Sequence, residues 1–570
     1  MLSRVVATRA FGYLATTLLA VFVYFYALDS QHIPRNGDEA VYAHITRLTA
    51  QSGQLLPLQS ALDNMRNTKP PLLFWQGIAS THWGQQWDWW HLRYPSVAYT
   101  LLTALLLFLL GKKITGRAET GFIAALTYLA FFSTYRYGRP FLVNPAEVFW
   151  CFLPFFTLLY WRPLSFESRL WIPLLLGVEI GIGLLYKSFA LLAPIGLILA
   201  GWYWHERRHQ WREFFKHDAA KPVLTGIVAL AIFGLWFVFD PDPQAVWNEF
   251  VVGENAAKFD AHSNGYWAQL LWGGSSVWVL LLGYPMNAGL LAFPVAALFV
   301  VAYRRRYQQS DTEKLIWIWI AVLFVIFAIP SQRSARYLLE AMPGVALLCA
   351  LNWQRLPRWV FLATLVACGA VLFLLVFLAT SLNREVSGLY TWAYWVLMGA
   401  TLALLLLALL KASWTRGLVN IVVLLTLLGL ATFLRPFDGT PGIYSAAAQR
   451  YVQGKEVWVS CNFRAGEEDR RFLLQGARVR GYNENWKLTA EQLAARYPIF
   501  TLQLPLDVAG CKECKVIGQR LEIRSRHSSE ELQAMLRGEV YQQLFVREWL
   551  LEAPHAPVTA GAGGQEEGCR

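Results

Sequence analysis

The sequence predicts an all-α polytopic membrane protein with about 13 transmembrane helices, followed by a small soluble α/β domain. Composition carries the first part of this prediction, because 56% of the 570 residues are hydrophobic and only 15% are charged. Soluble domains carry about 25% charged residues, so an ordinary soluble enzyme is excluded, as is a largely disordered chain. The positions of the apolar and basic residues supply two further observations.

The apolar residues gather in stretches close to the roughly 20 residues that a helix needs to cross a bilayer. The predicted spans lie near residues 11–29, 93–111, 119–135, 145–161, 170–186, 188–204, 222–240, 275–302, 315–330, 336–351, 358–380, 389–410 and 416–434. We expect the first stretch to remain as a span, because it is longer than the apolar part of a signal peptide. Residues 1–434 should therefore form one transmembrane domain.

Basic residues orient these spans. Alternate short loops hold, among others, Lys112, Arg162, Arg207, Arg304, Arg355 and Lys411. Cytoplasmic loops carry an excess of Lys and Arg, so these loops and the N-terminus should be cytoplasmic. An odd number of spans then puts the C-terminal domain on the other side. Membrane orientation explains the net charge of +12, and no nucleic-acid partner is expected.

The last part of the chain, residues 435–570, has a different pattern. Short β-like runs at 457–460 and 499–502 alternate with helical runs such as 490–497, which predicts a small extracytoplasmic α/β domain. A Gly/Ala-rich tail from about residue 556 should be disordered. A disulfide among Cys461, Cys511 and Cys514 fits an oxidising compartment, and the two cysteines at 511 and 514 are too few for a zinc site.

The first long outer loop, residues 30–92, begins with two adjacent carboxylates, Asp38 and Glu39. Asp38 precedes an amphipathic run, which predicts a helix near 38–53 with Asp38 as N-cap and Gly53 at its end. The helix is too short to cross the bilayer and should lie in the interface. A cap alone would explain Asp38, but two carboxylates at membrane depth are costly unless they are used, which favours catalysis.

A second candidate group in this loop is Lys69, which two prolines follow. Pro70 holds Lys69 extended, and the second proline favours the start of an interfacial helix near 71–84. Lys69 could be an anchor that reaches the lipid headgroups. We favour a phosphate ligand, because an ammonium and a helix N-terminus would act on the same anion.

Other charged residues lie outside, where the positive-inside rule disfavours them. Lys187 separates two apolar stretches with almost no loop, Arg139 precedes Asn144, and Arg333 and Arg336 precede Tyr337. Snorkelling to the headgroups would explain each one singly. A shared anionic ligand, such as a lipid phosphate, would explain them together.

The second long outer loop, residues 240–274, places Glu254 and Lys258 four residues apart in a helical pattern. Such a pair can form a solvated salt bridge, and it can equally belong to a site. Both interpretations stay open.

In this order the residues resemble the motifs of polyprenyl-phosphate-sugar glycosyltransferases with the GT-C fold. The chain looks most like bacterial aminoarabinose transferases of lipid A, and it resembles their relatives, the protein O-mannosyltransferases. The matching positions are Asp38-Glu39 with Tyr42, Lys69-Pro70, Lys187 with Phe189, Glu254 with Lys258-Phe259, and Arg336-Tyr337. The layout of about 13 spans and a small outer domain extends the resemblance to the whole chain.

The resemblance implies an inverting transfer on the periplasmic side of the bacterial inner (plasma) membrane. The donor would be a sugar on undecaprenyl phosphate, and the acceptor an envelope glycolipid such as lipid A or lipopolysaccharide, or alternatively a protein. Asp38, with Glu39 beside it, would be catalytic. The donor phosphate would bind Lys69, Lys187 and Arg336, with Tyr337 beside them. Weaker substrate contacts would be Tyr42, Arg139, Asn144, Glu254, Lys258 and Arg333.

Three departures from the family pattern bear on the cofactor and the sugar. Thr68 stands where a glutamate is common and Asn255 where a histidine is frequent, so no cofactor is expected and a divalent metal is disfavoured. Asn144 stands where an aspartate usually precedes proline, which leaves a neutral hexose or pentose open as the sugar. A transporter or flippase of lipid phosphate is the rival from another class, but the charges gather at one face and the sequence shows no internal repeat.

Overall fold

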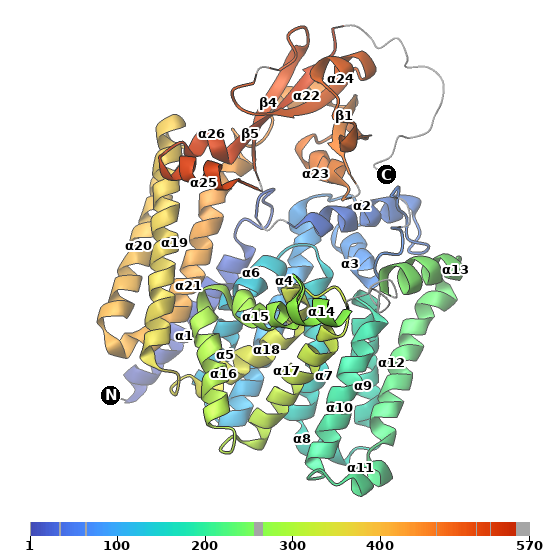
Figure 1. Cartoon of the computed structure of the whole chain (residues 1–570), viewed down its shortest axis with the longest axis vertical. Helices are drawn as coiled ribbons and strands as arrows, with labels where there is room; N and C mark the ends of the chain where they lie inside the picture. Colours follow the sequence, from blue (N-terminus) through green and yellow to red (C-terminus); the bar gives the residue numbers. More distant parts are fainter. Residues whose placement is uncertain are drawn as a thin grey trace.

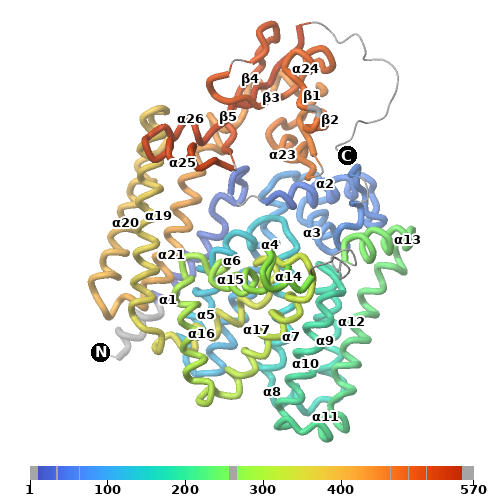
Figure 2. Tube along the Cα trace, in the orientation of Figure 1, coloured from blue at the N-terminus to red at the C-terminus, as the bar shows by residue number. Residues whose placement is uncertain are grey.

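The computed structural model describes residues 2–33, 36–62, 65–255, 266–462, 464–508, 510–524 and 526–554. A helical bundle forms the larger part, and a small sheet domain covers one end of it (Figure 1). Helix α1 begins at the opposite end of the bundle. Figure 2 shows that the N-terminal helices α2 and α3 lie between the bundle and the sheet domain.

Each predicted span contains a helix. These helices are α1 (Leu2–Phe25), α4 (Trp89–Thr115), α5 (Ala118–Ala130), α7 (Val143–Tyr160), α9 (Trp171–Tyr186), α10 (Leu192–Glu206), α12 (Ala220–Phe239), α15 (Val277–Ala288) with α16 (Ala292–Arg304), α17 (Asp311–Ala328), α18 (Met342–Asn352), α19 (Arg358–Glu385), α20 (Trp392–Leu410) and α21 (Ala412–Leu434). Among the described residues, 7 helical stretches are long and apolar enough to cross a membrane. The multi-pass helical architecture is confirmed, while the number 13 remains a prediction.

The outer surface of the bundle is apolar. Large side chains such as Phe239, Phe373 and Leu410 are more than two-thirds exposed, and a soluble protein rarely exposes such surface over many helices. Inside, small residues let helices approach closely. A Cβ on Gly177 of α9 would lie only 2.6 Å from the Val228 Cβ of α12, so this contact requires glycine.

The two helices of the first outer loop are α2 (Gly37–Ser52) and α3 (Leu72–Ser80). Gly53 ends α2 in the left-handed conformation, as predicted. The predicted N-cap was wrong, because the Asn36 side chain accepts the Asp38 backbone N–H and therefore takes that place. Asp38 stands in the first turn instead, so its carboxylate is free of the capping role. Helix α3 ends earlier than predicted, and Gly84 lies in the turn that follows.

Shorter helices connect these elements. They are α6 (Phe132–Tyr137), α8 (Arg162–Glu167), η1 (Phe189–Leu191), α11 (Trp211–His217), α13 (Pro243–Val246), the π-helix η2 (Trp247–Asn255), α14 (Tyr266–Trp272), η4 (Gly289–Leu291), η5 (Ala335–Ala341) and η6 (Arg435–Asp438). Two of them, η2 and η5, carry predicted site residues.

The C-terminal part forms the small α/β domain that the sequence predicts. Its strands are β1 (Glu456–Cys461), β2 (Arg478–Asn483), β3 (Ile499–Leu504), β4 (Lys515–Ile523) and β5 (Phe545–Glu552), in the order β2-β1-β3-β5-β4. Strand β1 pairs in parallel with β2 and β3, whereas β5 is antiparallel to β3 and β4. Its helices are α22 (Ala446–Val452), α23 (Gly466–Leu473), η7 (Glu484–Trp486), α24 (Ala490–Arg496), α25 (Ser529–Leu536) and α26 (Val540–Leu544).

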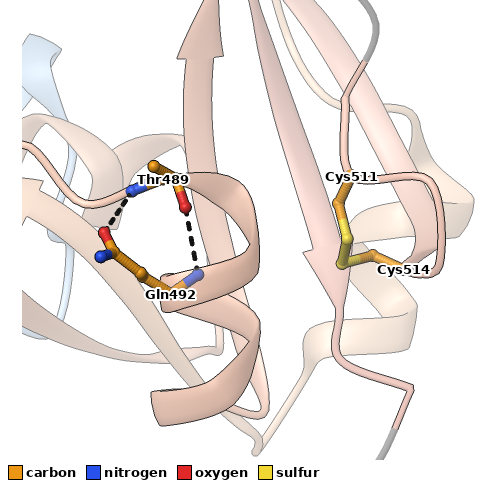
Figure 3. Close-up of a disulfide and its surroundings, with 4 residues drawn as sticks. All are labelled: Thr489, Gln492, Cys511 and Cys514. Atoms are coloured by element: carbon orange, nitrogen blue, oxygen red, sulfur yellow. Dashed lines mark hydrogen bonds between the residues drawn. A yellow bond between two sulfur atoms is a disulfide. The ribbon is translucent and has the colours of Figure 1, made fainter.

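The cysteines divide between the two parts as expected. Cys511 and Cys514 form a disulfide in this domain (Figure 3), and Cys461 is also disulfide-bonded. Cys151, Cys349 and Cys368 are buried free thiols in the bundle. The tail predicted to be disordered from about residue 556 lies outside the described residues. A disulfide at 511 and 514 leaves no thiolates there for a metal.

Candidate active site

A cavity of about 260 Å³ lies where α2, the end of α9, η2 and η5 meet. Its lining consists of Asp38, Val41, Tyr42, Met65, Thr68, Lys69, Val143, Lys187, Glu254, Arg336 and Tyr337. The lining includes the predicted catalytic aspartate and all the predicted phosphate ligands. Residues separated by almost 300 positions in the chain thus face one space.

Asp38 is bound directly to Arg336. The Arg336 Nη1 donates to Asp38 Oδ2 at 2.6 Å, while its Nε and Nη2 donate to Asn144 Oδ1 at 3.0 and 2.6 Å. Asn144 lies in the first turn of α7, so one guanidinium joins α2, α7 and η5. The Asp38 side chain stays 48% exposed. The arginine therefore holds a carboxylate that remains accessible from the cavity.

Lys69 reaches the cavity from the extended segment before α3. Its Nζ donates to Glu254 Oε1 at 2.5 Å and to Thr68 O at 2.8 Å. Glu254 comes from the end of η2, a π-helix, and π-helical geometry is frequent at functional sites. The pair joins the two long outer loops, and this contact was not predicted from the sequence, which paired Glu254 with Lys258.

Lys187 follows α9 directly and is paired with a carboxylate from inside the bundle. Its Nζ donates to Glu147 Oε2 at 2.7 Å, and the Asn144 Nδ2 donates to the same oxygen at 3.2 Å. Glu147 is 1% exposed, and Glu340, also 1% exposed, interacts with both Glu147 and Lys187. The network therefore runs without a break from Asp38 through Arg336, Asn144 and Glu147 to Lys187.

Glu147 and Glu340 are members of this network that the sequence interpretation missed. Both lie within predicted spans, at 145–161 and 336–351, among mostly apolar residues. An ionisable residue inside a span is by itself a signal of a functional site, because burying it in hydrocarbon is costly. That signal was available for both residues.

Two tyrosines complete the lining. Tyr42 on α2 is buried; burial raises the pKa of its hydroxyl, and the nearby Asp38 charge raises it further. The phenol therefore stays neutral and can donate a hydrogen bond. Tyr337 packs its ring 5.9 Å from that of Phe327. Tyr42 and Tyr337 can each offer a hydroxyl to a polar ligand in the cavity.

Glu39, the neighbour of Asp38, lies on the buried side of α2. It is 2% exposed and accepts hydrogen bonds from Arg93 Nε at 2.7 Å and Nη2 at 2.8 Å, and from the Phe141 backbone N at 2.7 Å. The cavity lining does not include it. This is the geometry of a structural ion pair that fixes α2 on α4, and the predicted catalytic role has no support from it.

Arg139 and Arg333 also lie away from the cavity lining. Arg139 is fully buried and donates to the carbonyl oxygens of Tyr24 and Tyr26, at the end of α1. Arg333 donates to Ala328 O at 2.7 Å, at the end of α17, and to Ser275 O at 2.9 Å. Both guanidinium groups satisfy carbonyls at helix C-termini, where cations are favoured. Lys258 lies outside the described residues.

A group with metal-ligand spacing occurs elsewhere in the described residues. His44, Glu467 and Glu468 come together between α2 and α23. The Glu468 carboxylate accepts hydrogen bonds from His44 Nδ1 and from Arg47. Burial alone would raise the pKa of Glu468, but the His44 hydrogen bond and the Arg47 charge outweigh burial and lower it to about 2. The group is an ion-paired contact between two domains.

Comparison with known proteins places this geometry in context. The family model "Dolichyl-phosphate-mannose-protein mannosyltransferase" matches residues 36–241. The undecaprenyl phosphate-alpha-4-amino-4-deoxy-L-arabinose arabinosyl transferase 2 of Proteus mirabilis is 23% identical over 411 residues, which cover 68% of each chain. The corresponding transferase of Pectobacterium carotovorum is 27% identical over 356 residues, covering 59% of this chain and 58% of its own length.

Solved structures agree with these relatives. The crystal structure of ArnT from Cupriavidus metallidurans bound to undecaprenyl phosphate superposes with a TM-score of 0.60 at 16% identity, covering 97% of this chain and 99% of that one. The apo form of the same protein gives a TM-score of 0.58. The chain thus shares the fold of this transferase and is similar in sequence to membrane glycosyltransferases that use aminoarabinose.

Proposed function

We propose that the chain transfers a sugar from undecaprenyl phosphate to an envelope glycolipid such as lipid A, with inversion at the anomeric carbon. The observation that carries this proposal is the cavity in which Asp38 faces Lys69, Lys187 and Arg336. A lipid phosphate is the ligand for such a cluster, because guanidinium and ammonium groups bind its oxygens through charge-assisted hydrogen bonds.

The three cations would act most strongly on the leaving group. When the sugar–oxygen bond breaks, the bonding electron pair goes to undecaprenyl phosphate, whose negative charge grows. Fixed cations around that charge stabilise the transition state more than the ground state. Each cation is paired with a carboxylate: Arg336 with Asp38, Lys69 with Glu254, and Lys187 with Glu147. The donor phosphate would therefore either displace these carboxylates from the cations or bind to the cations together with them.

Asp38 has two roles open to it. With a hydroxyl acceptor, its carboxylate would take the proton as the acceptor oxygen bonds to the anomeric carbon. With an acceptor phosphate, the attacking oxygen is already ionised and no proton moves. Asp38 would then orient the substrates or stabilise positive charge on the sugar. Both roles require the half-exposed position of Asp38 beside Arg336.

The relatives support the lipid part of the donor. The curated relatives are named for undecaprenyl phosphate-linked 4-amino-4-deoxy-L-arabinose, and the matched crystal structure holds undecaprenyl phosphate. If this chain uses the same kind of sugar as these relatives, the transferred sugar is a pentose. The Asn144 side chain is engaged by Arg336 and Glu147, so a carboxylate partner for a sugar amine is replaced by an amide at this position. A neutral hexose or pentose therefore stays within the proposal.

We further propose that residues 1–434 form the transmembrane domain, that the N-terminus is cytoplasmic, and that the domain at 435–570 faces the periplasm. The helices α2 and α3 would then lie at the outer interface, near a lipid phosphate. The Cys511–Cys514 disulfide supports this orientation, since disulfides persist in oxidising compartments. The free thiols of the bundle are all buried and are compatible with either side.

A protein acceptor is the alternative that the matched family model favours by its name. One experiment separates the acceptors and tests the proposal. Bacteria with the intact chain, with the Asp38→Asn variant and without the chain are compared by mass spectrometry of envelope lipids and membrane proteins. A sugar mass on lipid A that requires intact Asp38 supports the proposal. The same mass on protein favours the alternative, and no Asp38-dependent product of either kind rejects both.

A further inference from the structure

A second, larger cavity opens between the bundle and the C-terminal domain. It has a volume of about 950 Å³. The bundle side contributes Asn36, Gly37, Asp38, Ala40, Arg136 and Arg336, and the C-terminal domain contributes all of the remaining lining. Asp38 and Arg336 also line the first cavity. The two spaces therefore meet at the proposed catalytic aspartate.

This arrangement suits a displacement reaction with two substrates. An inverting transfer needs the leaving group and the attacking oxygen on opposite sides of the anomeric carbon. The first cavity, with a volume of about 260 Å³, is the size for one phosphorylated sugar and holds Lys69 and Lys187. The second cavity is also lined by Asp38, but its lining includes neither lysine. It is therefore available for the acceptor.

Arginine side chains give the second cavity its chemistry. Arg136, Arg336, Arg464, Arg470, Arg524 and Arg526 line it, against the carboxylates of Asp38, Asp469, Glu484 and Glu522. Some of these arginines are held by neighbouring carboxylates: Arg470 binds Glu548 at 2.7 Å, and Arg524 binds Glu531 at 2.7 Å. Arg136, Arg464 and Arg526 have exposed side chains.

Three of these guanidinium groups surround the Asp38 end of α2. Those of Arg136 and Arg336 lie 5.3 and 5.2 Å from the centre of the same Tyr137 ring. Arg464 reaches over from the C-terminal domain, and its Nη1 lies 3.6 Å from where a Cβ on Gly37 would be. Asp38 balances the charge of Arg336, and the rest of the lining still holds more guanidinium groups than carboxylates, which favours a bound anion.

Buried contacts between α23 and the bundle hold the C-terminal domain in the position that brings Arg464 to Gly37. Glu468 of α23 is fully buried and binds His44 and Arg47 of α2. The Phe472 ring stacks on Trp89 with centroids 4.1 Å apart. Figure 1 shows α23 directly over α2. The domain that carries Arg464 is thus anchored to the helix that carries Asp38.

We propose that the second cavity is the acceptor site, and that Arg464 and Arg526 of the C-terminal domain, with Arg136 of the bundle, bind the phosphate groups of a phosphorylated glycolipid headgroup. This inference rests on the proposed function and adds the acceptor's binding residues to it. In the reaction, an acceptor oxygen bonds to the anomeric carbon while the bond from that carbon to the donor phosphate oxygen breaks. A hydroxyl acceptor gives its proton to Asp38, and a phosphate acceptor brings none.

Direct binding tests the inference without relying on turnover. The full-length chain in nanodiscs is titrated with lipid A that carries both phosphates, with the same lipid A after dephosphorylation, and with undecaprenyl phosphate. The variants are Arg464→Glu and Arg526→Glu. The matched control is Arg537→Glu, an exposed arginine of the same domain that does not line the cavity.

We expect each cavity variant to bind phosphorylated lipid A roughly tenfold more weakly or worse, the loss of one charge-assisted hydrogen bond. The intact chain should bind dephosphorylated lipid A as weakly as the cavity variants bind the phosphorylated form. The affinity for dephosphorylated lipid A should be the same in the variants as in the intact chain. Undecaprenyl phosphate affinity should stay the same. Equal affinity for both forms of lipid A, or an equal loss in Arg537→Glu, overturns the inference.

The same samples separate this inference from the proposed function. If the intact chain binds phosphorylated lipid A through these arginines but transfers no sugar to any envelope lipid, the site stands and the transferase proposal fails. If transfer to lipid A is intact and the cavity variants match the wild-type acceptor KM, the transferase proposal stands and the acceptor site is wrong.

Discussion

The two sides of helix α2 hold adjacent carboxylates in opposite environments. Asp38 faces the cavity, stays 48% exposed and meets Arg336. Glu39 is 2% exposed and meets Arg93, which is 1% exposed. Successive residues on a helix point about 100° apart, because a turn takes 3.6 residues. One acid therefore serves a solvent-accessible site while its neighbour anchors the helix, and the same chemical pair has two different functions.

The largest expected effect comes from changing Asp38, the carboxylate on the cavity side of α2. Asp38→Asn should lower kcat by roughly 10²–10⁴-fold, whether the carboxylate acts as a base or orients charge. The helix should stay folded, because Asn36 provides the cap. Steady-state transfer by purified protein of unchanged thermal stability measures the effect. Turnover within twofold of wild type would remove Asp38 from the mechanism.

The buried side should respond in stability. Glu39→Gln leaves the Arg93 guanidinium buried without its counter-charge, and breaking a buried ion pair costs about 3–5 kcal/mol. Thermal unfolding in detergent should show a clear drop in Tm, while the folded fraction keeps transfer activity. A variant with normal stability and abolished turnover would instead give Glu39 the catalytic role that its burial argues against.

The cations of the cavity offer a smaller, more specific test. Lys69→Ala removes one contact to the donor phosphate and should weaken undecaprenyl phosphate binding by roughly tenfold. Glu254 is 29% exposed, so water can solvate it once its partner is gone. Lys314→Ala, a half-exposed lysine at the start of α17, is the control. Unchanged affinity in Lys69→Ala would remove this residue from the phosphate site.

The smallest effect at neutral pH concerns the contact between α2 and α23. The pKa of Glu468 is lowered to about 2 from its ordinary value of 4.5. A lowered folded-state pKa stabilises the contact above the ordinary value, and the stabilisation is lost as pH falls through about 2. The protection factors of the α23 amides against hydrogen exchange should therefore fall as the pH is lowered from 4.5 to 2. Glu468→Gln should weaken this pH dependence, and an unchanged profile in that variant would contradict the assignment.

The sequence could predict the architecture and much of the site, since both depend on local signals. Apolar stretches of membrane length, a carboxylate after the first span, and Lys69 before two prolines are each readable in order. The split between Asp38 and Glu39 was not readable, because it depends on Arg93 and the Phe141 backbone from distant elements. Arg139 and Arg333 looked like substrate ligands because pattern alone cannot show a distant helix C-terminus that needs a donor.

Undecaprenyl phosphate affinity and sugar transfer, measured on the same purified samples, test the central claim most directly. The claim is that Lys69, Lys187 and Arg336 hold the donor phosphate beside a catalytic Asp38. It predicts that Asp38→Asn binds undecaprenyl phosphate within about threefold of wild type but transfers sugar at least roughly 10²-fold more slowly, while Lys69→Ala loses roughly tenfold in affinity. Wild-type affinity in Lys69→Ala together with normal transfer by Asp38→Asn would contradict it.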